Sequence, residues 1–198
     1  MATPWRPLSV AEVGSLFPDR PARWWLSGGW AIDHWLGATT RSHGDIDVST
    51  LRPDLPALLG FLPSRMRPYG AAGGQLVPLA DVIDDPAVHN IWVHDRHRDG
   101  WVLQINVEEG DEGLWRYRRD PRVTLPWDRA VAVVRSLPTG TPATQLLWKS
   151  KGPRPRDEHD LDVTHAALGP DDRRWLRTAM ATAHPGSPWT SDPRLTDR

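Results

Sequence analysis

A short apolar run that ends in a pair of glycines constrains the fold of this chain more than any other feature. Residues 23–26, Arg-Trp-Trp-Leu, have the pattern of a buried strand, and they stop at Ser27-Gly28-Gly29. Beyond the glycines, apolar residues recur at helical spacing until Gly37, which suits the C-terminus of a helix. The sequence therefore predicts a strand, a tight glycine turn and a helix in immediate succession.

The remaining pattern predicts a mixed α/β part followed by a helical end. A capping box at Ser9 and Glu12 indicates a short helix that Pro18 stops. Further strands are expected at 45–49, 90–94, 101–109 and 131–134, a hairpin at 66–79, and helices at 55–62, 143–151, 157–168 and 171–183. We expect a core over residues 1–140, a helical part over 141–184 and a disordered tail over 185–198.

Composition excludes several classes of function. The chain of 198 residues has no cysteine, which excludes disulfide scaffolds, cysteine-ligated metals and thiol nucleophiles. Its net charge of -1 argues against binding nucleic acid by bulk electrostatics, although a local basic patch stays possible. No apolar run reaches the ~20 residues that a membrane helix needs, and the N-terminus lacks the pattern of a signal peptide. We therefore expect a cytoplasmic protein with no membrane partner.

Two aspartates and the glycine turn are the first candidates for chemistry. Asp45 and Asp47 alternate with apolar residues, so a strand would place both carboxylates on one face, where they suit Mg²⁺. The backbone amides of Gly28 and Gly29 at a helix start suit a phosphate. Each feature alone also fits an ordinary polar edge strand or an ordinary turn. Their order along the chain favours a combined site for a metal ion and phosphates.

These residues carry a resemblance to a known family. The segment GGWAIDHWLG-x3-RSHGDIDVS resembles the signature of the DNA polymerase β-like nucleotidyltransferase superfamily. More narrowly, it is similar to the small aminoglycoside 2''-adenylyltransferase and lincosamide nucleotidyltransferase group. The resemblance is dense over residues 25–49, thins between 50 and 100, and returns at 115–123 and 145–161. It implies an α+β fold with a mixed, mostly antiparallel sheet flanked by helices, followed by a small C-terminal helical part.

The resemblance also implies an activity and its ligands. A nucleoside monophosphate, AMP from ATP, would pass to a hydroxyl of a small acceptor such as an aminoglycoside, and pyrophosphate would leave. Asp45 and Asp47 would hold Mg²⁺, with two ions expected. The nucleotide would contact Ser27, Gly28, Gly29, Arg41, His43 and Lys149. Alternatively, Lys149 is only a cation near a helix C-terminus, where the helix dipole favours positive charge. The sequence does not indicate an oligomeric state.

A third carboxylate, which completes the site in family members, is where this chain departs from the pattern. Gln104, Asn106 and Glu108 share the polar face of the strand expected at 101–109, and the first two are amides where the family often has an acid. Glu108 is the candidate proton acceptor, with Glu109 possible if the strand is bulged. Glu108 could also merely end a strand. Alternatives are a nucleotide-binding module that lacks catalysis, or a nucleotidyltransferase that modifies a lincosamide, tRNA or protein.

Overall fold

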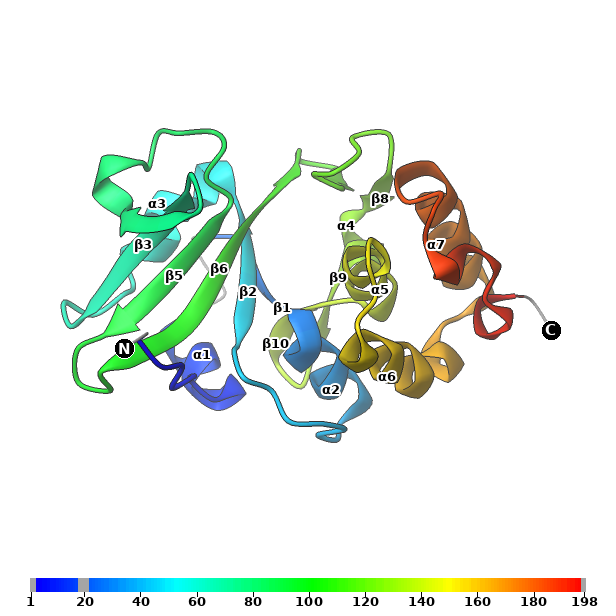
Figure 1. The fold of residues 1–198 in the computed structure, drawn as a ribbon, viewed down its shortest axis with the longest axis horizontal. Helices are drawn as coiled ribbons and strands as arrows, with labels where there is room; N and C mark the ends of the chain where they lie inside the picture. The colour runs from blue at the N-terminus through cyan, green and yellow to red at the C-terminus, as the bar shows by residue number, and fades with distance from the viewer. Residues whose placement is uncertain (1–2, 18–21, 197–198) are drawn as a thin grey trace. The chain divides into compact units, whose positions relative to one another are not determined.

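The chain folds into two compact units, which are described separately (Figure 1). The computed structural model describes residues 3–17 and 22–196. Met1–Trp30 and Ser42–Glu108 form the first unit, and Ala31–Arg41 and Glu109–Arg198 form the second. The boundary expected near residue 140 falls inside the second unit.

The first unit contains six neighbouring strands of the sheet. Its strands follow the order β4-β3-β5-β6-β2-β1. They are β1 (Trp24–Ser27), β2 (Asp47–Leu51), β3 (Met66–Ala72), β4 (Gln75–Pro78), β5 (Asn90–Asp95) and β6 (Gly100–Gly110), whose last two residues belong to the second unit. The β2–β6 pair is parallel and the other pairs are antiparallel. The predicted hairpin at 66–79 is confirmed as β3–β4, which turns at Gly73 and Gly74, both with positive φ.

Short helices accompany this sheet. Helix α1 (Val10–Leu16) begins at the predicted capping box, in which the Ser9 side chain accepts a hydrogen bond from the Glu12 amide. Pro18, the expected stop, lies outside the described residues. The elements η1 (Arg52–Asp54), α3 (Leu55–Leu59) and η2 (Leu79–Asp81) complete the unit. The core beneath the sheet includes the fully buried side chains of Leu26, Val48, Ile91, Leu103 and Ile105.

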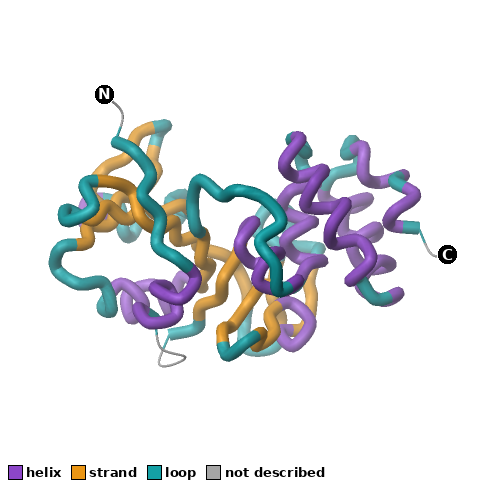
Figure 2. The backbone as a smooth tube through the Cα atoms, turned by 90° about the horizontal axis from the view of Figure 1, so that it is seen from below, coloured by secondary structure: helices purple, strands orange, loops and turns teal. Residues whose placement is uncertain are grey.

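The second unit is mainly helical (Figure 2). Helix α2 (Gly28–Leu36) begins in the first unit and continues into the second. Gly37 follows it with a φ of 77°, which confirms the predicted terminus. The later elements are β7 (Leu114–Arg116), β8 (Thr124–Pro126), α4 (Trp127–Ala130), β9 (Val131–Val134), β10 (Leu137–Gly140), α5 (Pro142–Ser150), α6 (Pro155–Thr164), η3 (His165–Ala167), α7 (Pro170–Ala183), η4 (Pro188–Ser191) and η5 (Pro193–Leu195). The sequence patterns missed β7, β8, β10 and α4.

The C-terminal segment differs from the disordered tail that its composition predicts. It forms η4 and η5, and the side chains of Trp189 and Leu195 are buried. Trp189 Nε1 donates a hydrogen bond of 2.6 Å to Glu158 Oε1. Two large apolar side chains anchor the segment, and the many Pro, Ser, Thr and Asp residues around them masked that signal.

The fold class agrees with the prediction. The described elements form a mixed, mostly antiparallel sheet with flanking helices, and a helical part follows toward the C-terminus. Within the described parts of the chain, no helix is both long and apolar enough to span a membrane.

Candidate nucleotide and metal site

The glycine turn and Asp47 are in direct contact. Ser27 and Asp47 are register partners at the adjoining ends of β1 and β2, which places both side chains on one face of the sheet. Gly28 follows with a φ of 69°, a left-handed conformation. A Cβ atom at Gly28 would lie only 2.3 Å from Asp47 Oδ2. Glycine is therefore required here twice, for its backbone conformation and for the close approach of the carboxylate.

Ser27 offers an unused hydroxyl at the same place. Its side chain is buried, and Oγ has no hydrogen-bond partner among the residues that the structure describes. A buried hydroxyl without a partner costs about 1–3 kcal/mol, so its retention needs a reason. Helix α2 begins at Gly28, so the positive end of its dipole lies at the same place. Together the hydroxyl and the helix start suit the oxygens of a phosphate.

Asp45 lies just before β2 rather than within it. The predicted strand over 45–49 begins two residues later, at Asp47. The alternation of exposure nevertheless extends back through Asp45, because Ile46 is fully buried while Asp45 and Asp47 are only half-buried. Both carboxylates are therefore more exposed than the intervening Ile46, as alternation along an extended segment would give.

Three hydrogen-bonded amide side chains extend from Asp47 across the sheet face. The parallel register pairs Asp47 with Gln104, while Asn106 lies opposite Asn90 on β5. Gln104 Nε2 and Asn90 Nδ2 each donate to Asn106 Oδ1 at 2.8 Å. Asn106 Nδ2 in turn donates to Asp47 Oδ1 at 3.3 Å. We call Asn90, Gln104 and Asn106 the amide network.

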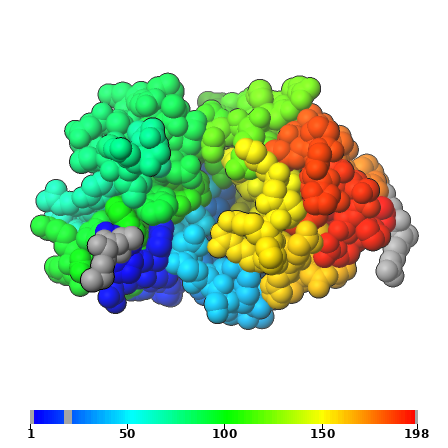
Figure 3. Space-filling view, in the orientation of Figure 1, coloured from blue at the N-terminus to red at the C-terminus, as the bar shows by residue number. Residues whose placement is uncertain are grey.

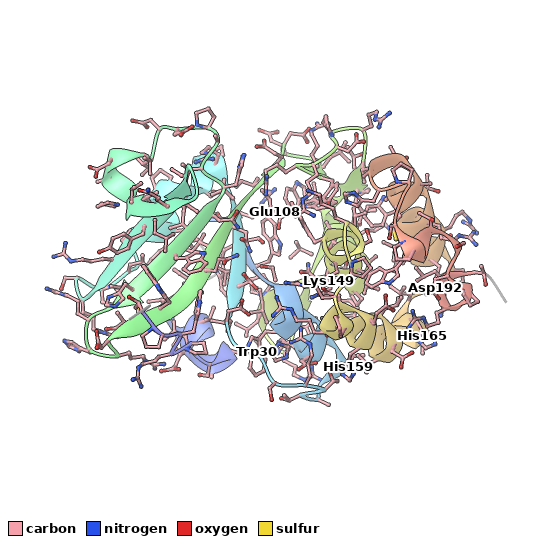
Figure 4. All side chains as sticks on the ribbon, viewed as in Figure 1. Trp30, Glu108, Lys149, His159, His165 and Asp192 are labelled. Atoms are coloured by element: carbon pink, nitrogen blue, oxygen red, sulfur yellow. The ribbon has the colours of Figure 1, made fainter. Side chains whose placement is uncertain are left out.

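Glu108 shares this face, but it lies farther from Asp47 than the amides. It is buried, and its register partner is Leu51 at the far end of β2. Four strand positions separate Gln104 from Glu108, which corresponds to about 13 Å along the sheet. In Figure 4, Glu108 accordingly lies well away from Trp30, which follows the glycine turn. The sequence therefore predicted correctly which face of β6 carries Glu108. The register between β2 and β6 does not, however, bring Glu108 to Asp47.

His43 lies against the first turn of α2. Its ring stacks on that of Trp30, with centroids 4.4 Å apart and planes inclined by 31°. The stack fixes His43 next to the residue that follows Gly29. Trp30 Nε1 is itself buried, and the described part of the chain offers it no hydrogen-bond acceptor. Five predicted residues therefore lie at or against the start of α2: Ser27, Gly28, Gly29, His43 and Asp47.

The two predicted cations, Arg41 and Lys149, belong to the second unit, where both form ion pairs with acidic side chains. Arg41 donates to both carboxylate oxygens of Asp160, from Nε at 2.7 Å and from Nη2 at 2.9 Å. Lys149 Nζ lies 2.8 Å from Asp160 and 3.2 Å from Asp157. Arg154 Nε donates to Asp157 at 2.7 Å. We call these five residues the ion cluster.

Electrostatics within the ion cluster favours full ionisation. Burial opposes ionisation of Asp157, but hydrogen bonds from Arg154 and the charge of Lys149 outweigh it and lower its pKa to about 2. Burial likewise opposes ionisation of Asp160, and Arg41 and Lys149 still hold its pKa below the ordinary value. The hydrogen bond to Asp160 raises the pKa of Arg41. The sequence patterns did not indicate that these acids pair with cations.

The residues near Asp47 fit a hard divalent ion that is also bound by phosphates. Asp47 supplies carboxylate oxygens beside Ser27 and the start of α2, and Asp45 lies two residues earlier in the chain. Among residues 3–17 and 22–196, no group of three or more His, Asp or Glu side chains could hold a metal ion by itself. Mg²⁺ commonly takes one or two carboxylates and completes its shell with phosphate and water.

Comparison with known families identifies the family of this chain. A family model described as aminoglycoside-2''-adenylyltransferase matches residues 9–163. The chain belongs to this family. The resemblance read from the sequence is thus confirmed, as is the prediction of a nucleotidyltransferase enzyme. No curated protein sequence matches the chain.

Solved structures share the fold of this adenylyltransferase family member. The solution structure of the antibiotic-resistance factor ANT(2'')-Ia is 17% identical with a TM-score of 0.54, covering 86% of this chain and 88% of that one. The crystal structure of ANT(2'')-Ia in complex with adenylyl-2''-tobramycin is 15% identical with a TM-score of 0.55, covering 87% and 95%. The lincomycin-bound lincosamide antibiotic adenylyltransferase LnuA is 18% identical with a TM-score of 0.52, covering 77% and 92%.

Proposed function

We propose that this protein transfers AMP from ATP to a hydroxyl of a small antibiotic-like acceptor such as an aminoglycoside, with Mg²⁺, in the cytoplasm. The observation that carries the proposal is the Asp47 carboxylate packed against Gly28 at the start of α2. That contact joins a ligand for a cation to donors for phosphate, and family membership supplies the reaction class. Pyrophosphate would be the leaving group.

The triphosphate would bind at the glycine turn. Ser27 Oγ and the amides of Gly28 and Gly29 would donate to its oxygens, and the positive end of α2 would add to the attraction. Asp45 and Asp47 would hold Mg²⁺, which supplies charge neutralisation on the phosphates when bound. Such positioning and electrostatic stabilisation account for most of the catalysis in phosphoryl and nucleotidyl transfer.

Three cationic or aromatic side chains would assist the nucleotide. His43 is held on Trp30 beside the turn and would donate to a phosphate or face the base. Arg41 and Lys149 would contribute positive charge, as the family resemblance implies. Because both are bound to Asp160, any phosphate contact would have to coexist with those ion pairs or replace them.

Glu108 is the proposed proton acceptor for the attacking hydroxyl. Its position along β6 requires an acceptor molecule that extends from Asp47 toward the end of the strand. We expect Glu108→Gln to lower kcat by about 10²–10⁴-fold, the range for general-base catalysis, with little change in nucleotide affinity. A decrease of less than tenfold, measured by pyrophosphate release, would remove Glu108 from the chemical step.

Mass spectrometry of acceptor adducts tests the proposal. The protein would be incubated with ATP, Mg²⁺ and a panel of aminoglycosides, lincosamides and nucleosides, with labelled tRNA and protein as further acceptors. An AMP adduct that Asp47→Asn abolishes would support the proposed reaction. An AMP adduct found only on tRNA or protein would show that the acceptor is a macromolecule rather than a small molecule. The absence of an adduct on every acceptor would contradict AMP transfer.

A nucleotide-binding module without catalysis is a second candidate. The observation that favours it is the amide network, which places Gln104 and Asn106 next to Asp47. Amides at these positions cannot accept a proton from a hydroxyl. Nucleotide affinity in calorimetry, together with no turnover for the whole acceptor panel, would favour this candidate over the enzyme.

A further inference from the structure

We infer that the site at Asp47 binds one divalent cation rather than two, and that Asn106 positions the Asp47 carboxylate for that ion. The inference rests on the proposed function, because the ion would be the Mg²⁺ that accompanies the nucleotide. The family resemblance implied two ions, whereas the residues of this chain favour one.

The amide network fixes which atom of Asn106 faces Asp47. Asn106 Oδ1 accepts two hydrogen bonds of 2.8 Å, from Gln104 and from Asn90. With the oxygen on that side, the amide nitrogen must lie toward Asp47 Oδ1, where it donates at 3.3 Å. A flipped amide would lose both accepted bonds and set oxygen against oxygen. Asn106 therefore presents an N–H donor, which repels a cation and cannot ligate one.

The same contacts assign different tasks to the two oxygens of Asp47. Oδ1 receives the Asn106 hydrogen bond, and Oδ2 lies against Gly28, on the side of the phosphate donors. The hydrogen bond holds the side-chain rotamer, so that Oδ2 faces the glycine turn before any ligand arrives. One well-placed oxygen suits one ion that is shared with the phosphates.

A second ion would lack ligands on this sheet face. Two ions held together lie about 3.5–4 Å apart and need negative charge close to both. Gln104 and Asn106 are neutral, and the nearest further acid on the face, Glu108, lies about 13 Å along the sheet from Gln104 by strand rise. The described ranges contain no group of three acids or histidines placed for a metal. Asp45 and Asp47 thus supply the carboxylate charge for a single ion.

Electron paramagnetic resonance with Mn²⁺ counts the ions without relying on turnover. A complex of the full chain with one equivalent of a non-hydrolysable ATP analogue would be titrated with Mn²⁺, and the bound ions would be counted per complex. The analogue alone, which binds Mn²⁺ through its phosphates, gives the reference affinity. We expect one Mn²⁺ per complex, bound more tightly than by the analogue alone, and loss of that added affinity in Asp47→Asn. Two Mn²⁺ per wild-type complex would overturn the inference and leave the proposed function standing, and one Mn²⁺ bound no more tightly than by the analogue alone would contradict both.

Two substitutions at Asn106 test its role. Asn106→Ala should keep a stoichiometry of one but weaken Mn²⁺ binding by about tenfold and broaden its spectrum, because the Asp47 rotamer is released. Asn106→Asp adds a carboxylate and should bind a second Mn²⁺. Circular dichroism would verify folding of both. Unchanged Mn²⁺ affinity in a folded Asn106→Ala would overturn the positioning role, and a single Mn²⁺ in a folded Asn106→Asp would overturn the ligand argument.

Discussion

Asp47 in the first unit and Asp160 in the second are held in opposite ways. An amide N–H and a glycine backbone contact Asp47, whereas two full positive charges, on Arg41 and Lys149, contact Asp160. Asp160 is completely buried, while Asp47 is only half-buried. A neutral donor such as the Asn106 amide orients a carboxylate without cancelling its charge. The charge of Asp160 is already balanced within the protein.

The acids of the ion cluster are hidden from the surface of the second unit. The segment that contains α6 reaches the viewed face of the molecule (Figure 3), yet the side chains of Asp157 and Asp160 are only 1% and 0% exposed. Their partners come from α5, from the segment before α6 and from the loop after α2. The ion cluster therefore ties three parts of the second unit together. An acid-rich helix start here serves the fold, whereas the acids near the glycine turn suit a ligand.

The largest expected effect is on Asp47. Asp47→Asn should lower the rate of AMP transfer at least about 10²–10³-fold, because several kcal/mol of transition-state stabilisation depend on the metal ligand. Asp128→Asn, an exposed change in α4, is the matched control and should leave the rate unchanged. Circular dichroism should show both variants folded. An Asp47→Asn rate within tenfold of wild type would remove Asp47 from the metal site.

The same change at Asp160 should damage stability instead. Asp160→Asn removes the charge that balances Arg41 and Lys149, and breaking such a buried pair costs about 3 kcal/mol. Urea unfolding at pH 7 measures the loss. Arg174→Gln, at an exposed ion pair with Asp171, should change the stability by less than about 0.5 kcal/mol. Equal losses in the two variants would mean that the ion cluster is no stronger than a surface pair.

Replacing Ser27 by alanine should raise the stability of the free protein but lower its affinity for ATP. Ser27→Ala removes a buried hydroxyl that has no partner within the described residues, so the free protein should gain about 1 kcal/mol. ATP affinity should fall several-fold because a phosphate donor is lost. Ser49→Ala, at another buried hydroxyl in the same situation on β2, should stabilise without weakening ATP. Thermal unfolding and calorimetry give the two readings, and unchanged ATP affinity in Ser27→Ala would exclude Ser27 from the phosphate site.

Acid should weaken the ion cluster over a defined pH range. The pKa of Asp157 falls from its ordinary value of 3.8 to about 2 in the folded chain, so its stabilisation is complete above about pH 4. Protonation then removes it as the pH falls from about 4 through 2. We expect Asp157→Asn to flatten that part of the curve of unfolding free energy against pH. An equally steep curve in the variant would assign the acid sensitivity elsewhere.

Local patterns in the sequence carried much of the fold and part of the site. The strand, glycine turn and helix around Gly28 were predictable because each signal is contained within a few neighbouring residues. The face that Glu108 shares with Asn106 was also predictable, from alternation along one strand. The position of Glu108 relative to Asp47 was not, since it depends on the register between β2 and β6, which are distant in the chain. The same distance in sequence hid the pairing of Arg41 with Asp160.

The buried C-terminal segment sets where this chain can be shortened. Trp189 and Leu195 fill space in the second unit, and Trp189 also donates a hydrogen bond to Glu158 on α6. A chain cut after His184 would leave a cavity at least as large as a tryptophan side chain, and losing such a residue from a core costs about 3–5 kcal/mol. An affinity tag is therefore better appended after the last residue than exchanged for this segment, although its composition resembles that of a dispensable linker.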